Sequence, residues 1–280
     1  MTLRTYRDVT GPDASGILEQ VTEQRERVRA RLAAVRRVVA VMSGKGGVGK
    51  SYLTAAIARA AGERWPGGVG VIDADLKSPT VARVLGASGP LRLTDAGVEP
   101  ARDPAGVRVI STEFLLATGR PLGWREPGAE QFVWRGALEA GVLREFLSDV
   151  IWGPLELLLV DLPPGADGVA DLKALVPELT GAIAVTIPTD ESERSVARAL
   201  AAARDAEIPL LGVIENMAGA RASDGTEMGA LFSGDAGRAL AQAFSIPLLA
   251  HVPFAMPGPG AGAADALDAA ARARVLEALR

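Results

Sequence analysis

The feature that most constrains this chain is a glycine-rich stretch, Gly44–Ser51, which joins two segments of different character. The preceding run Val38–Val41 is apolar and mostly β-branched, which favours a strand. The residues that follow, to about Arg64, are rich in alanine, which favours a helix. The stretch has the spacing Gly-x4-Gly-Lys-Ser of a phosphate-binding P-loop, in the strand–loop–helix context that a P-loop requires. The sequence therefore predicts a nucleotide-binding site between a strand and a helix.

Each residue type in this loop suits phosphate and magnesium chemistry. Glycines let successive backbone N–H groups converge on phosphate oxygens, and the following helix adds the positive end of its dipole. Lys50 supplies a positive charge to the β- and γ-phosphates, and the Ser51 hydroxyl is a hard oxygen ligand for Mg²⁺. We therefore expect ATP and Mg²⁺ as cofactors. The predicted nucleotide contacts of the loop are Gly44, Lys45, Gly46, Gly47, Val48, Gly49, Lys50, Ser51 and Tyr52.

Acidic residues at two strand ends are candidate metal ligands. Val69–Ile72 is followed by Asp73-Ala74-Asp75, and a later apolar run is followed by Asp161. The carboxyl ends of parallel strands meet at one edge of a sheet, so these acids are expected beside the P-loop. Asp161 then has the Walker B arrangement that holds Mg²⁺, and Asp75 can meet the metal and a water molecule. Alternatively, Asp73 or Asp75 only caps the helix that follows.

Two further positions are candidate nucleotide contacts. Gly165 closes the segment Asp161-Leu162-Pro163-Pro164-Gly165, and its backbone N–H could bond the γ-phosphate. Asn216 ends a predicted strand, and its side-chain amide can satisfy both a donor and an acceptor of adenine. Asn216 could equally cap a helix or make a turn, and its residue type leaves these alternatives open.

The composition excludes several classes of function. The chain of 280 residues has a net charge of −4, which argues against broad non-specific DNA binding. It contains no cysteine, so it has no disulfide, no thiol nucleophile and no thiolate ligand for an iron–sulfur cluster. Its single histidine, His251, lies in an apolar strand and is given no catalytic role. No apolar run is long enough to span a bilayer and the N-terminus lacks a signal peptide, so we expect a cytoplasmic protein.

The alternation of strands and helices predicts the fold class. Several strands are apolar without polar alternation, as central strands of a parallel sheet are. We therefore expect an α/β fold, a doubly wound and mostly parallel sheet with helices on both faces. Residues 1–36 are expected to form an N-terminal arm and an amphipathic helix, and residues 37–280 a P-loop ATPase domain. Later strands are predicted at Val107–Ser111, Leu155–Val160, Ile183–Ile187, Leu210–Ile214 and Pro247–Val252. Helices are predicted at about 15–36, 130–150, 192–206 and 231–244 and near the C-terminus.

Several segments together resemble one family. They read VMSGKGGVGKS, VIDADLKSPTVARVLG, VWRG, DVIWGPLELLLVDLPPG and VIENMAG. Over roughly residues 37–256 the chain resembles the Mrp-type (ApbC-like) ATPases, which are iron–sulfur cluster carriers. This family belongs to the MinD/ParA group, whose deviant P-loop GKGGVGKS has a second lysine.

The resemblance implies a Mg²⁺-dependent ATPase that forms a face-to-face homodimer with ATP at the interface. It implies that Lys45 reaches the ATP of the partner protomer, that Lys50 is the P-loop lysine, and that Asp75 lies near the attacking water. Ser51, Asp75 and Asp161 are then the metal ligands, and Asn216 contacts adenine. Turnover is expected to be low, and Lys45, Lys50 and Asp75 are the expected catalytic residues.

The chain departs from the family at several positions. Family members hold a bridging cluster through a Cys-x-x-Cys pair shortly after the ENM segment, where this chain reads ARASDGTEMGALF. The oxygen donors there (Ser223, Asp224 and Glu227) suit a soft iron–sulfur centre poorly. Tyr52 also replaces a threonine of the family and Ser78 a glycine. The ATPase half of the family function is therefore expected, whereas cluster binding by this chain is doubtful.

Three roles remain open for such an ATPase. The resemblance favours iron–sulfur protein maturation, with assembly proteins or a cysteine-bearing homologue as partners. A MinD/ParA-like positioning or regulatory switch would act on a membrane or DNA, but the acidic net charge and the C-terminal helix without lysines oppose it. We thus expect neither nucleic acid nor membrane as a partner. The third role is a non-hydrolysing ATP sensor.

Overall fold

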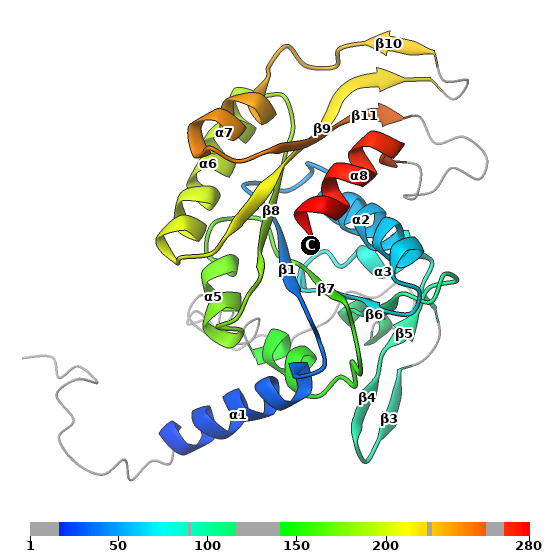
Figure 1. The fold of residues 1–280 in the computed structure, drawn as a ribbon, viewed down its shortest axis with the longest axis vertical. Coiled ribbons are helices and arrows are strands. Elements are labelled where there is room, and N and C mark those ends of the chain that lie inside the picture. The colour runs from blue at the N-terminus through cyan, green and yellow to red at the C-terminus, as the bar shows by residue number, and fades with distance from the viewer. Residues whose placement is uncertain (1–16, 89–90, 116–140, 223–225, 256–265) are drawn as a thin grey trace, which may run out of the picture.

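The computed structural model describes residues 17–88, 91–115, 141–222, 226–255 and 266–280. Its centre is a nine-stranded sheet with the order β10-β9-β8-β1-β7-β2-β6-β5, in which β11 also pairs with β9 (Figure 1). All pairings among the seven central strands are parallel. These strands are β1 (Val38–Ser43), β2 (Val69–Asp73), β6 (Arg108–Ile110), β7 (Leu157–Asp161), β8 (Gly181–Thr186), β9 (Leu210–Arg221) and β11 (Leu248–Ala255).

Short antiparallel strands border this parallel centre. β5 (Ala101–Arg102) pairs with β6, and β10 (Glu227–Gly229) pairs with the end of β9. β3 (Arg92–Thr94) and β4 (Gly97–Glu99) form a separate two-stranded hairpin. The sheet is therefore mostly parallel, as predicted.

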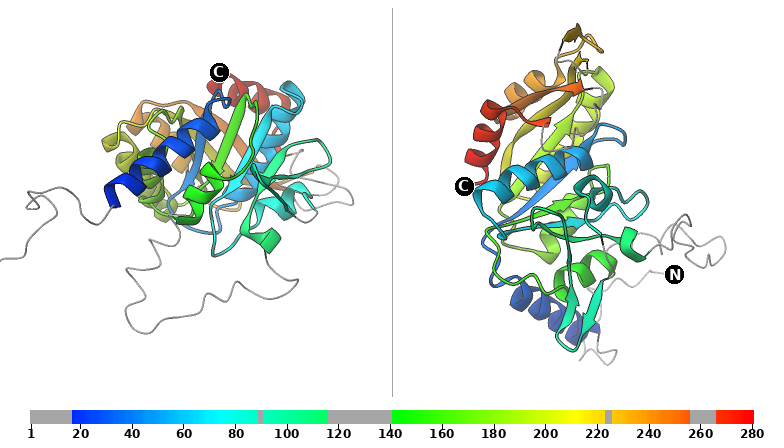
Figure 2. Two further views of the ribbon diagram at one scale, coloured as in Figure 1. Left: turned by 90° about the horizontal axis from the view of Figure 1, so that it is seen from below. Right: turned by 90° about the vertical axis from the view of Figure 1, so that its right-hand side faces the viewer.

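Helices cover both faces of the sheet, which gives the doubly wound architecture (Figure 2). Alternate residues of β1 enter two different cores, because successive side chains of a strand point to opposite faces. One core contains side chains of α1, α5, α6, α7 and the helical residues 141–148. The other contains side chains of α2, α3 and α8. The helices are α1 (Ile17–Leu32), α2 (Lys50–Arg64), α3 (Val81–Leu85), α5 (Gly168–Leu175), α6 (Asp190–Asp205), α7 (Ala236–Phe244) and α8 (Ala269–Ala278), and Thr112–Leu115 is a 3₁₀ turn, η2.

Some boundaries differ from the predictions. The first helix ends at Leu32 rather than near residue 36, because the chain then forms a bridge between Val35 and Leu155 ahead of β1. α7 begins at Ala236 rather than near residue 231. The predicted helix 130–150 is helical over 141–148, and its remainder, including the VWRG segment, lies outside the described residues. None of the described helices is long and apolar enough to cross a bilayer.

The strand register brings the predicted site together. Val41 of β1 and Asp73 of β2 are both register partners of Asp161 on β7. Because these strands are parallel, their carboxyl ends lie at the same edge of the sheet, where the P-loop follows β1. This edge is where ligands bind in open α/β sheets.

Candidate nucleotide-binding site

The P-loop runs from the end of β1 to the start of α2 and is open on one side. Gly47 has a φ of +79° and Gly49 a φ of +82°, a left-handed region that favours glycine. A Cβ placed on Gly46 or Gly47 would meet no atom within 4 Å. The loop thus has the backbone conformation and the open space that a phosphate group needs.

The other side of the loop is held tightly by two elements distant in sequence. A Cβ on Gly44 would lie 2.2 Å from the backbone carbonyl carbon of Ser195 on α6. A Cβ on Gly49 would lie 2.2 Å from Nδ2 of Asn216 on β9. These two glycines are therefore required by close packing, in addition to any contact with phosphate.

Asn216 supports the loop directly. Its side chain is almost buried, and Nδ2 donates a hydrogen bond to the Val48 carbonyl at 2.8 Å. In this structure the amide donor that could recognise adenine is thus engaged by the P-loop itself. The adenine contact of Asn216 stays a prediction.

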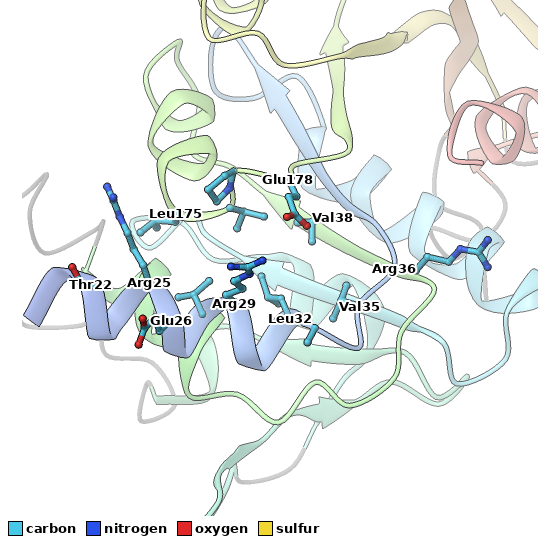
Figure 3. A pocket seen from close by; sticks show the side chains of 14 residues that line it. Thr22, Arg25, Glu26, Arg29, Leu32, Val35, Arg36, Val38, Leu175 and Glu178 are labelled. Atoms are coloured by element: carbon cyan, nitrogen blue, oxygen red, sulfur yellow. The ribbon is translucent and has the colours of Figure 1, made fainter. Parts of the chain in front are cut away.

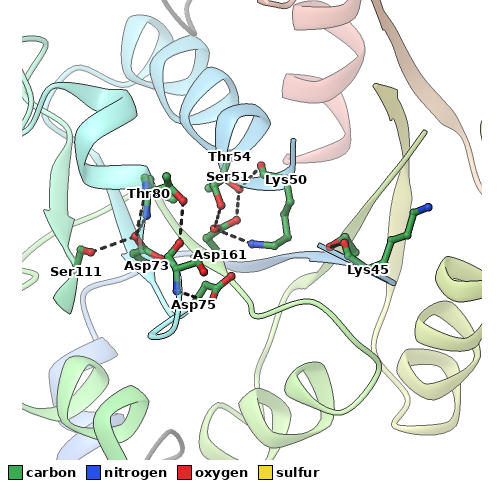
Figure 4. Close-up of polar contacts among 12 residues, drawn as sticks. Lys45, Lys50, Ser51, Thr54, Asp73, Asp75, Thr80, Ser111 and Asp161 are labelled. Carbon is green, nitrogen blue, oxygen red and sulfur yellow. Dashed lines mark hydrogen bonds and ion pairs between the residues drawn. The ribbon is translucent and has the colours of Figure 1, made fainter. Parts of the chain in front are cut away.

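Lys50, Ser51 and Thr54 converge on Asp161 (Figure 4). Lys50 Nζ lies 2.7 Å from Asp161 Oδ2, and the Ser51 hydroxyl donates to the same oxygen at 2.6 Å. The Thr54 hydroxyl lies 2.6 Å from the other carboxylate oxygen, Oδ1. The Asp161 side chain is fully buried and that of Lys50 is nearly so, which makes this an ion pair of low solvent access.

This group fits a magnesium–nucleotide complex by its chemistry. The Ser51 hydroxyl and the Asp161 carboxylate are the hard oxygen donors that Mg²⁺ prefers. Lys50 Nζ is buried, and among the described residues it has no acceptor aligned for a hydrogen bond, although it pairs electrostatically with Asp161. Its N–H groups are therefore available for phosphate oxygens at the mouth of the loop.

Asp73 lies beside Asp161 and is fully buried. Its Oδ2 accepts hydrogen bonds from the backbone N–H groups of Thr80 and Val81 at 2.9 and 3.1 Å, and from the Ser111 hydroxyl at 3.1 Å. Burial, and then the charge of Asp161, raises the pKa of Asp73 to about 7. Asp73 therefore has the capping role that the sequence allowed for Asp73 or Asp75, because it accepts hydrogen bonds from N–H groups at the start of α3.

Asp75 has a different environment from Asp73. It is partly exposed, and its Oδ1 accepts a hydrogen bond from the Ser78 backbone N–H at 3.2 Å. Figure 4 places it close to the ends of β2 and β7, near Asp161 and Lys50. This position is compatible with the predicted contact to metal and water, which stays a prediction.

Lys45 points away from the Lys50–Asp161 pair (Figure 4). Its side chain is 34% exposed, and Nζ lies 3.7 Å from the exposed carboxylate of Glu191 at the start of α6. The ammonium group of Lys45 therefore faces the surface rather than the loop that carries it.

The backbone N–H of Gly165 already has a hydrogen-bond acceptor within the protein. Its N–H donates to the Ser43 carbonyl at 2.9 Å, at the junction of β1 and the P-loop. The predicted γ-phosphate contact would require this bond to be exchanged. Tyr52, also predicted to contact the nucleotide, is 38% exposed on the first turn of α2.

The segment in place of the family's cysteine pair is a hairpin. β9 continues past the predicted end at Ile214 to Arg221, and β10 returns beside it. Ser223 and Asp224 lie outside the described residues, whereas Glu227 is exposed on β10. In the described part of the chain no three side chains of the metal-binding types gather. Since the chain has no cysteine, the residues present do not fit an iron–sulfur cluster.

Two residues of the site were not assigned a site role from the sequence. Thr54 lies one helical turn after Lys50, so the spacing from Ser51 to Thr54 on one face of α2 was an available signal. Asp73 was named among the strand-end acids and as a possible cap, but only Asp75 was assigned a site role. The pairing of Asp73 with Asp161 depends on the order of β2 and β7 in the sheet. Strand order is not visible in a local pattern.

Comparison with known proteins agrees with this geometry. Residues 34–266 match the family described as ParA: NUBPL iron-transfer P-loop NTPase. The "Iron-sulfur cluster carrier protein" of Saccharolobus solfataricus is 34% identical over 246 residues, which cover 86% of this chain and 79% of that protein. The human "Cytosolic Fe-S cluster assembly factor NUBP2" is 37% identical over 233 residues, which cover 80% of this chain and 81% of that protein.

Solved structures agree as well. A nucleotide-binding protein from Archaeoglobus fulgidus in complex with ADP has a TM-score of 0.66 and 31% identity, and the match covers 84% of this chain and 87% of that one. The cell division ATPase MinD of Pyrococcus furiosus, at 19% identity and a TM-score of 0.52, shares the fold alone. With the P-loop, the strand-end acids and the doubly wound sheet in place, the chain belongs to the ParA/NUBPL family of iron-transfer P-loop NTPases.

Proposed function

We propose that this protein is a Mg²⁺-dependent ATP-binding switch that hydrolyses ATP slowly as a homodimer and serves iron–sulfur protein maturation in the cytoplasm. The observation that carries the proposal is the convergence of Lys50, Ser51 and Asp161 beneath an open P-loop. It supplies the positive charge and the hard oxygen donors that a magnesium–nucleotide complex requires.

Each side chain of the site has a separate role in the proposed switch. Lys50 binds the β- and γ-phosphates, while Ser51 and Asp161 hold Mg²⁺, which when bound neutralises phosphate charge. Asp75 orients the attacking water, and its partial exposure keeps it within reach of solvent. Lys45, whose ammonium group faces outward, reaches the phosphates bound by the partner protomer. Loss of the γ-phosphate then removes contacts that hold the neighbouring segments, and the affinity for a partner protein changes.

The absence of cysteine bears on the role proposed for this member of the family in cluster assembly. Relatives are named as cluster carriers and assembly factors, but this chain has no thiolate to hold a cluster. We propose that it supplies the ATP-driven step while an assembly protein or a cysteine-bearing homologue supplies the cluster ligands.

Affinity capture with the Asp75→Ala variant tests this assignment. The variant is loaded with ATP and Mg²⁺ in native extract, and the same variant without nucleotide is the matched control. Enrichment of iron–sulfur enzymes, scaffolds or a cysteine-bearing homologue only in the loaded sample supports the proposal. Enrichment of chromosomal, envelope or unrelated metabolic proteins instead would show that the family function has been lost.

A non-hydrolysing ATP sensor is the second candidate. It is favoured by the N–H of Gly165, which is already bonded to Ser43 rather than presented to a phosphate, and by Tyr52 in place of the family's threonine. Steady-state phosphate release distinguishes the two candidates, because a sensor binds ATP without measurable turnover.

A further inference from the structure

A second hollow lies at the edge of the sheet opposite the P-loop. It is a pocket of about 530 Å³ between α1 and the segment that joins α5 to β8 (Figure 3). Val38, the first residue of β1, lines this pocket, whereas the P-loop follows the last residue of β1. The length of the strand, about 20 Å for six residues, therefore separates the two sites. The volume lies within the range of about 300–1,000 Å³ that is usual for small-molecule sites.

One part of the pocket wall is apolar. Val28 and Leu32 contribute from α1, Val35 and Val38 from the entry to β1, and Val176 from the end of α5. Four of these five side chains are buried in one core of the domain, and Val35 packs against them. The wall is thus a fixed part of the fold and lines the pocket with apolar atoms.

Arginines line the remaining wall. Arg25 and Arg29 are separated by four residues on α1, so their side chains emerge about 5–6 Å apart on one face of the helix. Figure 3 shows both on the side of α1 that faces the pocket. Within the described residues neither guanidinium has a hydrogen-bond or ion-pair partner. By contrast, Arg31 on the same helix donates to the carbonyls of Ser148 and Ala96.

The charge of the lining opposes the charge of the chain. Three arginines (Arg25, Arg29 and Arg36) and two glutamates (Glu26 and Glu178) line the pocket, although the whole chain has a net charge of −4. Arg36 already pairs with Glu156 at 3.5 Å, so Arg25 and Arg29 are the arginines left to meet a ligand. Two unpaired guanidinium groups one helical turn apart can bind the same anionic group, since each presents a fork of N–H donors. The lining therefore suits a ligand with an apolar body and one anionic group.

We propose that this pocket binds a small amphipathic anion, with an apolar body of acyl or aryl size and one carboxylate, sulfonate or phosphate group. The apolar body lies against Val28, Val35 and Val176, and the anionic group bridges Arg25 and Arg29. The site is distinct from the nucleotide site because it has no glycine loop and none of the predicted metal ligands. It is independent of the proposed ATPase function.

Calorimetric titration of the full-length protein with decanoate tests the proposal. We expect saturable binding with a Kd below about 1 mM, and no such binding of decanol, which lacks the charge, or of acetate, which lacks the apolar body. Arg25→Gln and Arg29→Gln should each weaken binding about tenfold, as expected for loss of a charge-assisted hydrogen bond. Glu178→Gln should strengthen it, because a negative charge leaves the lining.

Arg27→Gln is the matched control. Arg27 is exposed on the same helix but does not line the pocket, so this variant should bind decanoate like the wild type. The four variants should bind ATP with unchanged affinity. The proposal is overturned if decanoate does not bind at about 1 mM, if Arg27→Gln weakens binding as much as Arg25→Gln and Arg29→Gln do, or if ATP displaces decanoate from the protein.

Discussion

Removal of the P-loop lysine should destabilise the nucleotide-free protein as well as abolish nucleotide binding. Lys50 Nζ lies 2.7 Å from the fully buried carboxylate of Asp161, so Lys50→Ala leaves a buried charge without its counter-charge. Asp73, a second buried carboxyl group, is the register partner of Asp161 on the neighbouring strand and adds to the repulsion. Asp161 ends β7, and all five residues of that strand are buried.

The structure sets the size of the effect. At 2.7 Å and an effective dielectric constant of about 20, two unit charges attract with about 6 kcal/mol. The hydroxyls of Ser51 and Thr54 still contact Asp161 in the variant and offset part of the loss. Removal of one partner from a buried ion pair usually costs about 3–5 kcal/mol. We therefore expect Lys50→Ala to lower the free energy of unfolding by about 3–5 kcal/mol at neutral pH.

Urea unfolding followed by circular dichroism, without nucleotide or Mg²⁺, measures this change. Lys45→Ala is the matched control, because Lys45 is a partly exposed lysine of the same loop, 3.7 Å from an exposed glutamate. It should change stability by less than about 1 kcal/mol. Lys50→Ala combined with Asp161→Asn should recover most of the loss, since the buried charge is gone. A Lys50→Ala protein within about 1 kcal/mol of the wild type, or no recovery in the double variant, would refute the reasoning.

Three further predictions concern the same edge of the sheet. The pKa of Asp73 is raised from 3.8 to about 7, so its contribution to stability is fully present below about pH 4 and is lost as the pH rises through about 7. In urea unfolding without nucleotide, Asp73→Asn should therefore gain stability relative to the wild type as the pH rises from about 4 to about 7, and the difference should then stay level. Lys45→Ala should bind ATP normally but lose ATP-dependent dimerisation and phosphate release, and wild-type turnover in that variant would contradict the role in trans. Asn216→Ala should weaken binding of ADP, which calorimetry measures, because the Val48 carbonyl loses its donor. An Asn216→Asp variant also lacks the Nδ2 donor and should bind ADP as weakly in the same titration. Wild-type affinity for ADP in either variant would show that the Asn216 amide does not support the P-loop.

The local motifs predicted where the glycine-rich loop and Asp161 lie in the fold. Gly44–Ser51 joins a strand to a helix whose first residues are Lys50 and Ser51, and Asp161 ends a buried parallel strand. Both predictions rest on spacing and hydrophobic pattern within a few residues, where sequence carries the information. The ion pair between Lys50 and Asp161 could not be predicted, because it depends on the position of β7 beside β1.

The end of β9 depends on partners that lie far away in the sequence. The strand was predicted over Leu210–Ile214 with Glu215-Asn216-Met217 at its end, yet it continues to Arg221. Glu215 is buried since its two carboxylate oxygens accept from the Gly237 N–H at 2.7 Å and contact His251 Nδ1 at 2.9 Å. These partners come from α7 and β11, so no local pattern could reveal that the acid is satisfied inside the sheet.

The close packing of Gly44 on α6 and of Gly49 on Asn216 has a consequence for engineering. The shape of the loop is imposed from outside by two elements that follow it by more than a hundred residues in the chain. A graft of the octapeptide onto another scaffold would carry every phosphate-binding residue type and still lack the walls that hold the backbone in place. A graft that keeps the loop in shape would have to include the start of α6 and the middle of β9 as well. The smallest part of this protein that could carry the nucleotide site to another scaffold is therefore a tertiary arrangement and not a peptide.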